Sequence, residues 1–109
     1  MPSPLVTVIL PAKDAGAYIG TTLETLRRQF DDLSALKLVA IDDGSRDDTG
    51  ALMRHYAESF THAEVIVNRM PQGLASARNQ GLAHVEGEAF CFVDGDDWMQ
   101  PGRLQVLAD

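Results

Sequence analysis

Apolar residues follow two alternating patterns along the 109-residue chain. Four short runs are apolar or β-branched almost throughout, as expected of buried strands, and they cover residues 5–10, 36–41, 64–67 and 89–93. Pro11 is expected to end the first of these strands. Between the runs, apolar residues recur every three or four positions, which predicts helices over residues 17–30, after a cap at Asp47 or Asp48, and over 73–85.

The third predicted helix should turn four apolar residues toward the core, namely Leu74, Ala77, Leu82 and Val85. Pro101 occupies a favourable first position for a last short helix. Strands that are apolar throughout and alternate with amphipathic helices specify a parallel sheet with helices on both faces. We therefore predict one doubly wound α/β domain, Rossmann-like in its winding, over residues 1–109.

Composition excludes several classes of protein. The net charge of -7 argues against a nucleic-acid partner, because phosphate backbones require a basic face. No apolar run approaches the length of a membrane span, and residues 1–4 do not resemble the start of a secretory signal. Cys91 is the single cysteine, so neither an intramolecular disulfide nor a thiolate zinc site can form. These features predict a protein of the cytoplasm or of the cytoplasmic face of the membrane.

The acidic residues gather in two clusters, each directly after an apolar run. Asp42 and Asp43 follow the second predicted strand, and Asp94, Asp96 and Asp97 follow the fourth. In doubly wound sheets ligands bind at the carboxyl ends of the strands, so both clusters should lie at one edge. Carboxylates separated by one residue suit hard divalent cations, which are commonly shared with substrate phosphates. The sequence therefore predicts a cation site for Mn²⁺ or Mg²⁺ at this edge.

Four segments, in this order and spacing, resemble glycosyltransferase family 2, whose catalytic domains have the GT-A fold. They are Val-Ile-Leu-Pro-Ala at 8–12, Val-Ala-Ile-Asp-Asp-Gly-Ser-Arg-Asp-Asp-Thr at 39–49, Gly-Leu-Ala-Ser-Ala-Arg-Asn-Gln-Gly at 73–81 and Phe-Val-Asp-Gly-Asp-Asp-Trp at 92–98. The resemblance covers nearly the whole chain and corresponds to the N-terminal, nucleotide-sugar-binding half of the family's domain.

The resemblance implies roles for particular residues of the donor site. Asp43 matches the aspartate that recognises the nucleobase, and Asp96 matches the metal ligand. Asp94 matches an aspartate that meets the ribose or a water near the metal. Pro11 and Ala12 occupy positions that line the nucleoside pocket.

Other positions depart from the family pattern or lie beyond it. Arg78 matches the Ala-Arg-Asn segment beside the donor site, where it could neutralise a diphosphate or pair with a carboxylate. Lys13 and Asp14 stand where a common form of the family has an aromatic residue and Asn, so no aromatic stacking on the base is expected from them. The family's general base is a carboxylate in the second half of the domain, and it is expected beyond Asp109 together with the acceptor-binding elements.

The resulting functional hypothesis is the donor-binding part of an inverting, metal-dependent glycosyltransferase. A nucleotide-diphosphate sugar, with a UDP-sugar favoured, would be the donor, and the hydroxyl of a glycan, lipid or protein would be the acceptor. A noncatalytic nucleotide-sugar-binding or interaction module is the alternative. A phosphatase of the haloacid-dehalogenase type is disfavoured, because its Asp-x-Asp motif follows the first strand and Asp94–Asp96 follows the fourth. Capping roles for Asp42, Asp47 and Asp48, and a solvated position for Lys13, stay open beside ligand roles.

Overall fold

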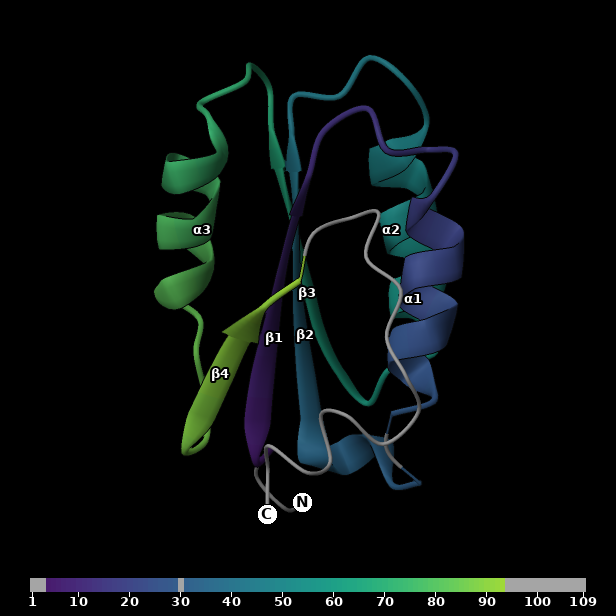
Figure 1. Cartoon of the computed structure of the whole chain (residues 1–109), viewed down its shortest axis with the longest axis vertical. Helices are drawn as coiled ribbons and strands as arrows, with labels where there is room; N and C mark the ends of the chain where they lie inside the picture. The colour runs from purple at the N-terminus through teal and green to yellow at the C-terminus, as the bar shows by residue number, and fades with distance from the viewer. Residues whose placement is uncertain (1–3, 30, 94–109) are drawn as a thin grey trace.

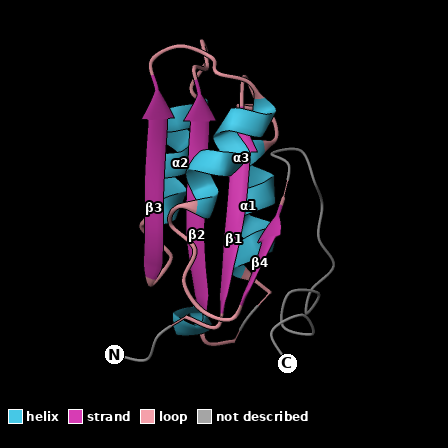
Figure 2. Ribbon diagram, turned by 90° about the vertical axis from the view of Figure 1, so that its left-hand side faces the viewer, coloured by secondary structure: helices cyan, strands magenta, loops and turns pink. Residues whose placement is uncertain are grey.

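The computed structural model describes residues 4–29 and 31–93 of the chain. A parallel sheet of four strands in the order β3-β2-β1-β4 forms its centre (Figure 2). The strands are β1 (Val6–Ala12), β2 (Leu36–Asp43), β3 (His62–Asn68) and β4 (Ala89–Phe92). The helices are α1 (Ile19–Arg27), α2 (Thr49–Ala57) and α3 (Leu74–Leu82), and a 3₁₀ turn covers Leu33–Ala35.

The winding of the chain reverses at β1. From β1 the chain proceeds outward through β2 to β3, and α1 and α2 cover one face of the sheet (Figure 1). It then crosses through α3, on the opposite face, and returns to β4 on the other side of β1. The predicted doubly wound α/β fold is confirmed, and such reversals are where ligands bind.

Each face of the sheet has its own hydrophobic cluster. The larger cluster lies under α1 and α2 and includes Leu10, Leu23, Leu38 and Met53, all fully buried. The smaller one lies under α3 and consists of the buried residues Ile9, Val39, Ile41 and Ala77. Transfer of these apolar side chains from water is the main favourable term for folding.

Of the four residues predicted to face the core from the third helix, Ala77 is buried and Val85 packs against the same cluster, but Leu74 and Leu82 do not face the core. Leu74 and Leu82 are 50% and 39% exposed, whereas Ala77 and Gly81 are buried. A Cβ placed on Gly81 would collide with the side chain of Ile9. The helix therefore approaches the sheet through two small residues, Ala77 and Gly81, and this close approach leaves Leu74 and Leu82 outside the contact.

Several element boundaries also differ from the prediction. Pro11 does not end β1, because the parallel register with β2 continues through Pro11 and Ala12. Pairing with β4 ends at Ile9, so Pro11 borders only one strand, and the loss of its backbone N–H is tolerated there. Helices α1 and α3 are shorter than expected, at nine residues each. The helix predicted at Pro101 lies outside the described residues.

A charged cluster ties the opposite end of the sheet together. Lys37 lies within the buried strand β2, and its ammonium group donates to the carbonyl of His84 and the carboxylate of Glu86, each at 2.8 Å. The carboxylate of Glu64 on β3 lies 3.0 Å from the same ammonium group. A buried lysine is tolerated where such partners replace the water that it loses.

Candidate functional site

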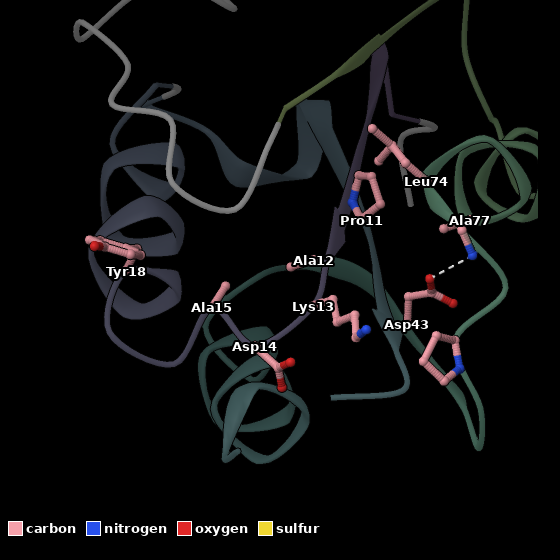
Figure 3. A pocket seen from close by; sticks show the side chains of 11 residues that line it. Pro11, Ala12, Lys13, Asp14, Ala15, Tyr18, Asp43, Leu74 and Ala77 are labelled. Atoms are coloured by element: carbon pink, nitrogen blue, oxygen red, sulfur yellow. Dashed lines mark hydrogen bonds between the residues drawn. The ribbon is translucent and has the colours of Figure 1, made fainter. Parts of the chain in front are cut away.

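A pocket of about 460 Å³ opens at the carboxyl ends of β1 and β2 (Figure 3). Its volume falls within the range of roughly 300–1,000 Å³ that small-molecule sites occupy. The lining residues come from β1, the loop after it, the end of β2, the β3–α3 turn and the start of α3: Pro11, Ala12, Lys13, Asp14, Ala15, Tyr18, Asp43, Pro71, Gly73, Leu74 and Ala77. The pocket thus lies where the winding of the chain reverses, as the fold class predicts.

Three of the site residues expected from the sequence line this pocket. Pro11 and Ala12 form its floor at the end of β1, and Asp43 faces them from the end of β2. Because β2 runs to Asp43, Asp42 and Asp43 are strand residues whose side chains point to opposite faces. Strand alternation therefore separates the two aspartates, and only Asp43 lines the pocket.

The carboxylate of Asp43 is held by donors from three directions. Its Oδ1 accepts hydrogen bonds from the Asn68 side-chain amide at 3.0 Å and from the Gln72 backbone N–H at 2.9 Å. Its Oδ2 accepts one from the Gly73 backbone N–H at 3.0 Å, drawn as the dashed line in Figure 3. Asp43 therefore fixes the β3–α3 turn, a structural role that the sequence did not indicate.

These contacts also determine the charge state of Asp43. Burial by itself raises the pKa of this carboxyl group, which is only 5% exposed. The hydrogen bonds from Gln72, Asn68 and Gly73 act the other way, as does the positive charge of Lys13. Together they outweigh burial and lower the pKa of Asp43, so the pocket contains a carboxylate ionised at neutral pH.

A reciprocal amide pair lies behind Asp43. The Asn68 side chain at the end of β3 donates to the carbonyl oxygen of Gln80 at 2.8 Å and accepts from the amide of Gln80 at 2.8 Å. Asn68 is the partner of Asp43 in the β2–β3 register, and Gln80 lies on α3. Neither residue was singled out from the sequence, where an amide at a strand end and one on a helix are both ordinary surface residues.

The β1–α1 loop lines another side of the pocket and is hydrogen-bonded to the β2–α2 loop. The backbone N–H groups of Asp14, Ala15 and Gly16 donate to the side chains of Ser45, Thr49 and Asp47, at 2.9, 2.8 and 2.9 Å. In return the carboxylate of Asp14 accepts from the Arg46 backbone N–H at 2.7 Å. The β1–α1 loop, which carries Lys13 into the pocket, is therefore shaped by the β2–α2 loop.

Asp14 itself has a φ of 51°, in the left-handed region. Aspartate tolerates this region better than most residues because its short side chain forms local hydrogen bonds. The departure from the family pattern at this position thus has a structural account, since the carboxylate of Asp14 holds the two loops together.

Asp42 and Asp47 accept backbone hydrogen bonds around the start of α2. Asp42 accepts from the Ser45 backbone N–H at 3.0 Å, and its carboxylate lies against Gly50 in the first turn of α2. Asp47 accepts from the Thr49 backbone N–H at 3.0 Å. Asp48 occupies the N-cap position of α2 but makes no side-chain cap bond. Of the two caps predicted from the sequence, Asp47 supplies the hydrogen bond.

Arg78 and the second acidic cluster are not part of the described pocket. The guanidinium of Arg78 lies over the ring of Phe92, 5.2 Å from its centroid, and Arg78 does not line the pocket. Asp94, Asp96 and Asp97 lie outside the described residues, so the predicted cation site does too. Among residues 4–29 and 31–93, no group of three or more His, Cys, Asp or Glu side chains could hold a metal ion.

The segment that leads to the second acidic cluster runs beside β1. Val93, the last described residue, donates its backbone N–H to the carbonyl of Ile9 at 2.9 Å.

No helix in the described part of the chain has the length and apolar character needed to cross a bilayer.

Comparisons with known proteins agree on one family. The family model described as glycosyl transferase family 2 matches residues 7–109. The uncharacterized glycosyltransferase EpsJ of Bacillus subtilis is 33% identical over 106 residues, which make up 97% of this chain and 30% of EpsJ.

Two solved structures have closely similar folds. The first, S. aureus TarS 1-349 in complex with UDP-GlcNAc, is 28% identical, with a TM-score of 0.88 over 95% of this chain and 30% of that one. The second is the mannosyltransferase PcManGT from Pyrobaculum calidifontis in complex with GDP-Man and Mn²⁺. It is 27% identical, with a TM-score of 0.84 over 99% of this chain and 31% of PcManGT. The chain thus spans about a third or less of the length of these proteins.

Proposed function

The chain belongs to glycosyltransferase family 2, and on this premise we propose that it forms the donor-binding part of an inverting, metal-dependent glycosyltransferase. The donor would be a nucleotide-diphosphate sugar and the acceptor a hydroxyl group. The observation that carries the proposal is the pocket at the carboxyl ends of β1 and β2, with the ionised Asp43 on its wall. Membership of this family also removes the haloacid-dehalogenase alternative.

The acceptor capacity of Asp43 favours a uracil base. A carboxylate offers about four acceptor positions, and Asn68, Gln72 and Gly73 fill three of them. The remaining position, on Oδ2, suits a single imide N–H such as that of uracil. Guanine presents two adjacent donors, which would require two free positions. We therefore expect UDP to bind in preference to GDP and ADP.

Lys13 complements this arrangement. Its side chain lines the same pocket, and its charge lowers the pKa of Asp43, so the ammonium group lies within electrostatic reach of the carboxylate. An ammonium donor beside a carboxylate acceptor matches a base edge on which an N–H is flanked by carbonyl oxygens.

The divalent cation would be held by the second acidic cluster, with Asp96 as its ligand and Asp94 near the ribose or a metal-bound water. The described aspartates fit a metal poorly, because Asp42, Asp43 and Asp47 already accept hydrogen bonds from backbone N–H groups. When bound, Mn²⁺ or Mg²⁺ would neutralise the charge of the diphosphate leaving group. PcManGT, whose structure includes Mn²⁺, supports this expectation.

The general base is proposed to lie in a part of the protein that corresponds to the unmatched length of the relatives. Within the described pocket the two acidic residues are Asp14 and Asp43, and both are engaged by backbone donors. Asp14 links the two loops and Asp43 is assigned to the nucleobase, so the proposal gives the role of general base to neither. The cytoplasmic location stays a prediction from the sequence.

Isothermal titration calorimetry with UDP, GDP and ADP, each with and without Mn²⁺, tests the proposal. We expect UDP to bind best and only with metal, because without it the diphosphate meets a cluster of carboxylates. Asp96→Asn should abolish the metal dependence, and Asp97→Asn, the matched control, should change it much less. Equal binding of all three nucleotides regardless of metal would contradict the donor-site assignment.

A second assay separates the enzyme from the noncatalytic module. The 109-residue chain is expected to bind the donor without transferring its sugar to a panel of hydroxyl acceptors. A longer protein that includes the general base is expected to transfer it. Absence of transfer in that longer protein, with donor binding intact, would favour the noncatalytic alternative.

A further inference from the structure

The hydrogen bonds behind Asp43 form a chain that crosses three elements. Asp43 ends β2, Asn68 ends β3 and Gln80 lies on α3, and each is joined to the next by side-chain hydrogen bonds of 2.8–3.0 Å. Gln80 does not line the pocket, and its side-chain amide pairs with that of Asn68. Its side chain is therefore linked to Asp43 through Asn68.

Gln80 determines how the Asn68 amide is oriented. Asn68 is only 7% exposed, so its polar atoms need partners within the protein. One of its two N–H groups goes to Asp43, and the other goes to Gln80. Its carbonyl oxygen accepts from Gln80. If the Asn68 amide alone turned over, its oxygen would face the Asp43 carboxylate and, with the Gln80 amide as it stands, both bonds to Gln80 would be lost.

The orientation of Asn68 in turn decides which oxygen of Asp43 stays available. Asn68 and Gln72 both donate to Oδ1, whereas Gly73 alone donates to Oδ2. With Oδ1 occupied twice, Oδ2 is the oxygen that keeps an acceptor position. Without the bond from Asn68 the carboxylate could rotate and divide its free capacity between both oxygens.

We propose that Gln80, through its reciprocal amide pair with Asn68, is a positioning residue that holds Asp43 in the orientation that accepts the nucleobase N–H of the donor. The proposal rests on the proposed function, in which Asp43 reads the base. It assigns to Gln80 a share of the base specificity although Gln80 does not touch the nucleotide.

The test compares UDP with N3-methyl-UDP, which lacks the imide N–H, in the presence of Mn²⁺. We expect the unaltered chain to prefer UDP, and Gln80→Met to reduce that preference about fivefold, the effect of one well-placed hydrogen bond. Methionine matches glutamine in length and helix propensity, so α3 should be retained. Ser76→Ala, an exposed position on the same helix, is the control and should leave the preference unchanged.

A second variant tests the same chain of bonds within one folded protein. Asn68→Asp places a second carboxyl group beside Asp43, which raises the upper pKa of the pair. When that group is protonated it can donate to Asp43 as the amide does, and when it is ionised it repels Asp43. The preference for UDP should therefore be lost at pH 8 and regained toward pH 5, which a general loss of stability would not produce.

The outcomes separate the two claims. If the unaltered chain does not prefer UDP over N3-methyl-UDP, Asp43 does not read the base and the proposed function fails at that point. If the preference exists but survives Gln80→Met, the positioning role of Gln80 is overturned while base recognition stands, whatever Asn68→Asp shows. Should Gln80→Met fail to fold, Gln80→Leu takes its place with the same expectation, and Asn68→Asp reports on the Asn68–Asp43 bond.

Discussion

Replacing Asp43 with asparagine should destabilise the domain as well as weaken nucleotide binding. The carboxylate accepts from Asn68 and Gln72 on one oxygen and from Gly73 on the other. Asparagine has a single acceptor oxygen, so at least one donor loses its partner and faces an NH₂ group. The remaining hydrogen bonds become neutral ones. With hydrogen bonds to a charged group at roughly 1.5–3 kcal/mol and neutral ones near 1 kcal/mol, Asp43→Asn should cost about 3 kcal/mol in free energy of unfolding.

The sign of the pH dependence follows from the lowered pKa of Asp43. Between the folded pKa and the unfolded value of about 3.9, the unfolded chain binds more protons, so stability rises with pH. The contribution of Asp43 is therefore fully present at pH 7 and is lost as the pH falls through the folded pKa. The difference in stability between the unaltered chain and Asp43→Asn should shrink in acid.

Urea denaturation at pH 7 and at steps down to pH 3 measures both quantities. Asp42→Asn is the matched control, because Asp42 accepts one backbone bond from Ser45, and the remaining oxygen of asparagine can keep it. We expect the control to lose less than about 1 kcal/mol. If Asp43→Asn were as stable as the unaltered chain at pH 7, the anchoring of the β3–α3 turn by Asp43 would be refuted.

Three further substitutions test other parts of the structure. Thr49→Val removes the acceptor of the buried Ala15 N–H and should lower the free energy of unfolding by about 1–3 kcal/mol in urea denaturation. An unchanged midpoint would argue against the hydrogen bonds between the two loops. Gly81→Ala inserts a methyl group against Ile9 and should lower the thermal midpoint by the equivalent of about 1–3 kcal/mol; a higher midpoint would show that α3 is not in such close contact. Lys13→Ala should weaken UDP binding in calorimetry about threefold to tenfold, since it removes one donor from the pocket, and equal affinity would assign Lys13 to a solvated loop.

The fold could be predicted because its determinants are periodic. Parallel strands that are apolar throughout and helices with one apolar face leave few arrangements, and the order of elements followed from their alternation. The packing of α3 could be predicted only in part. Ala77 was expected to face the sheet and does, but the close contact at Gly81 was not expected, because a glycine carries almost no hydrophobic signal beside Leu74 and Leu82. Lys37 within a buried strand is similar, because its partners Glu64 and Glu86 lie far along the chain.

The candidate site could likewise be predicted in part. Pro11, Ala12 and Asp43 could be located because they follow predicted strands, and the carboxyl ends of parallel strands meet at one edge. The hydrogen bonds that shape the site join groups 12 to 34 positions apart, such as the side chains of Asn68 and Gln80 or the backbone N–H of Ala15 and the hydroxyl of Thr49. The pattern of apolar and polar residues along the sequence does not indicate which distant residues pair. Asp42 and Asp43 look equivalent as neighbours in sequence, and the extension of β2 by two residues assigns them to opposite faces.

The bonds between the β1–α1 and β2–α2 loops have a consequence for engineering donor specificity within this family. Residues 14–16 take their conformation from the side chains of Ser45, Asp47 and Thr49, some thirty positions further along the chain. A graft that moves only the first loop from a relative with another nucleotide would bring backbone N–H groups that meet unmatched side chains. The two loops are therefore a single unit of exchange, and chimaeras should carry residues 12–18 and 44–49 together.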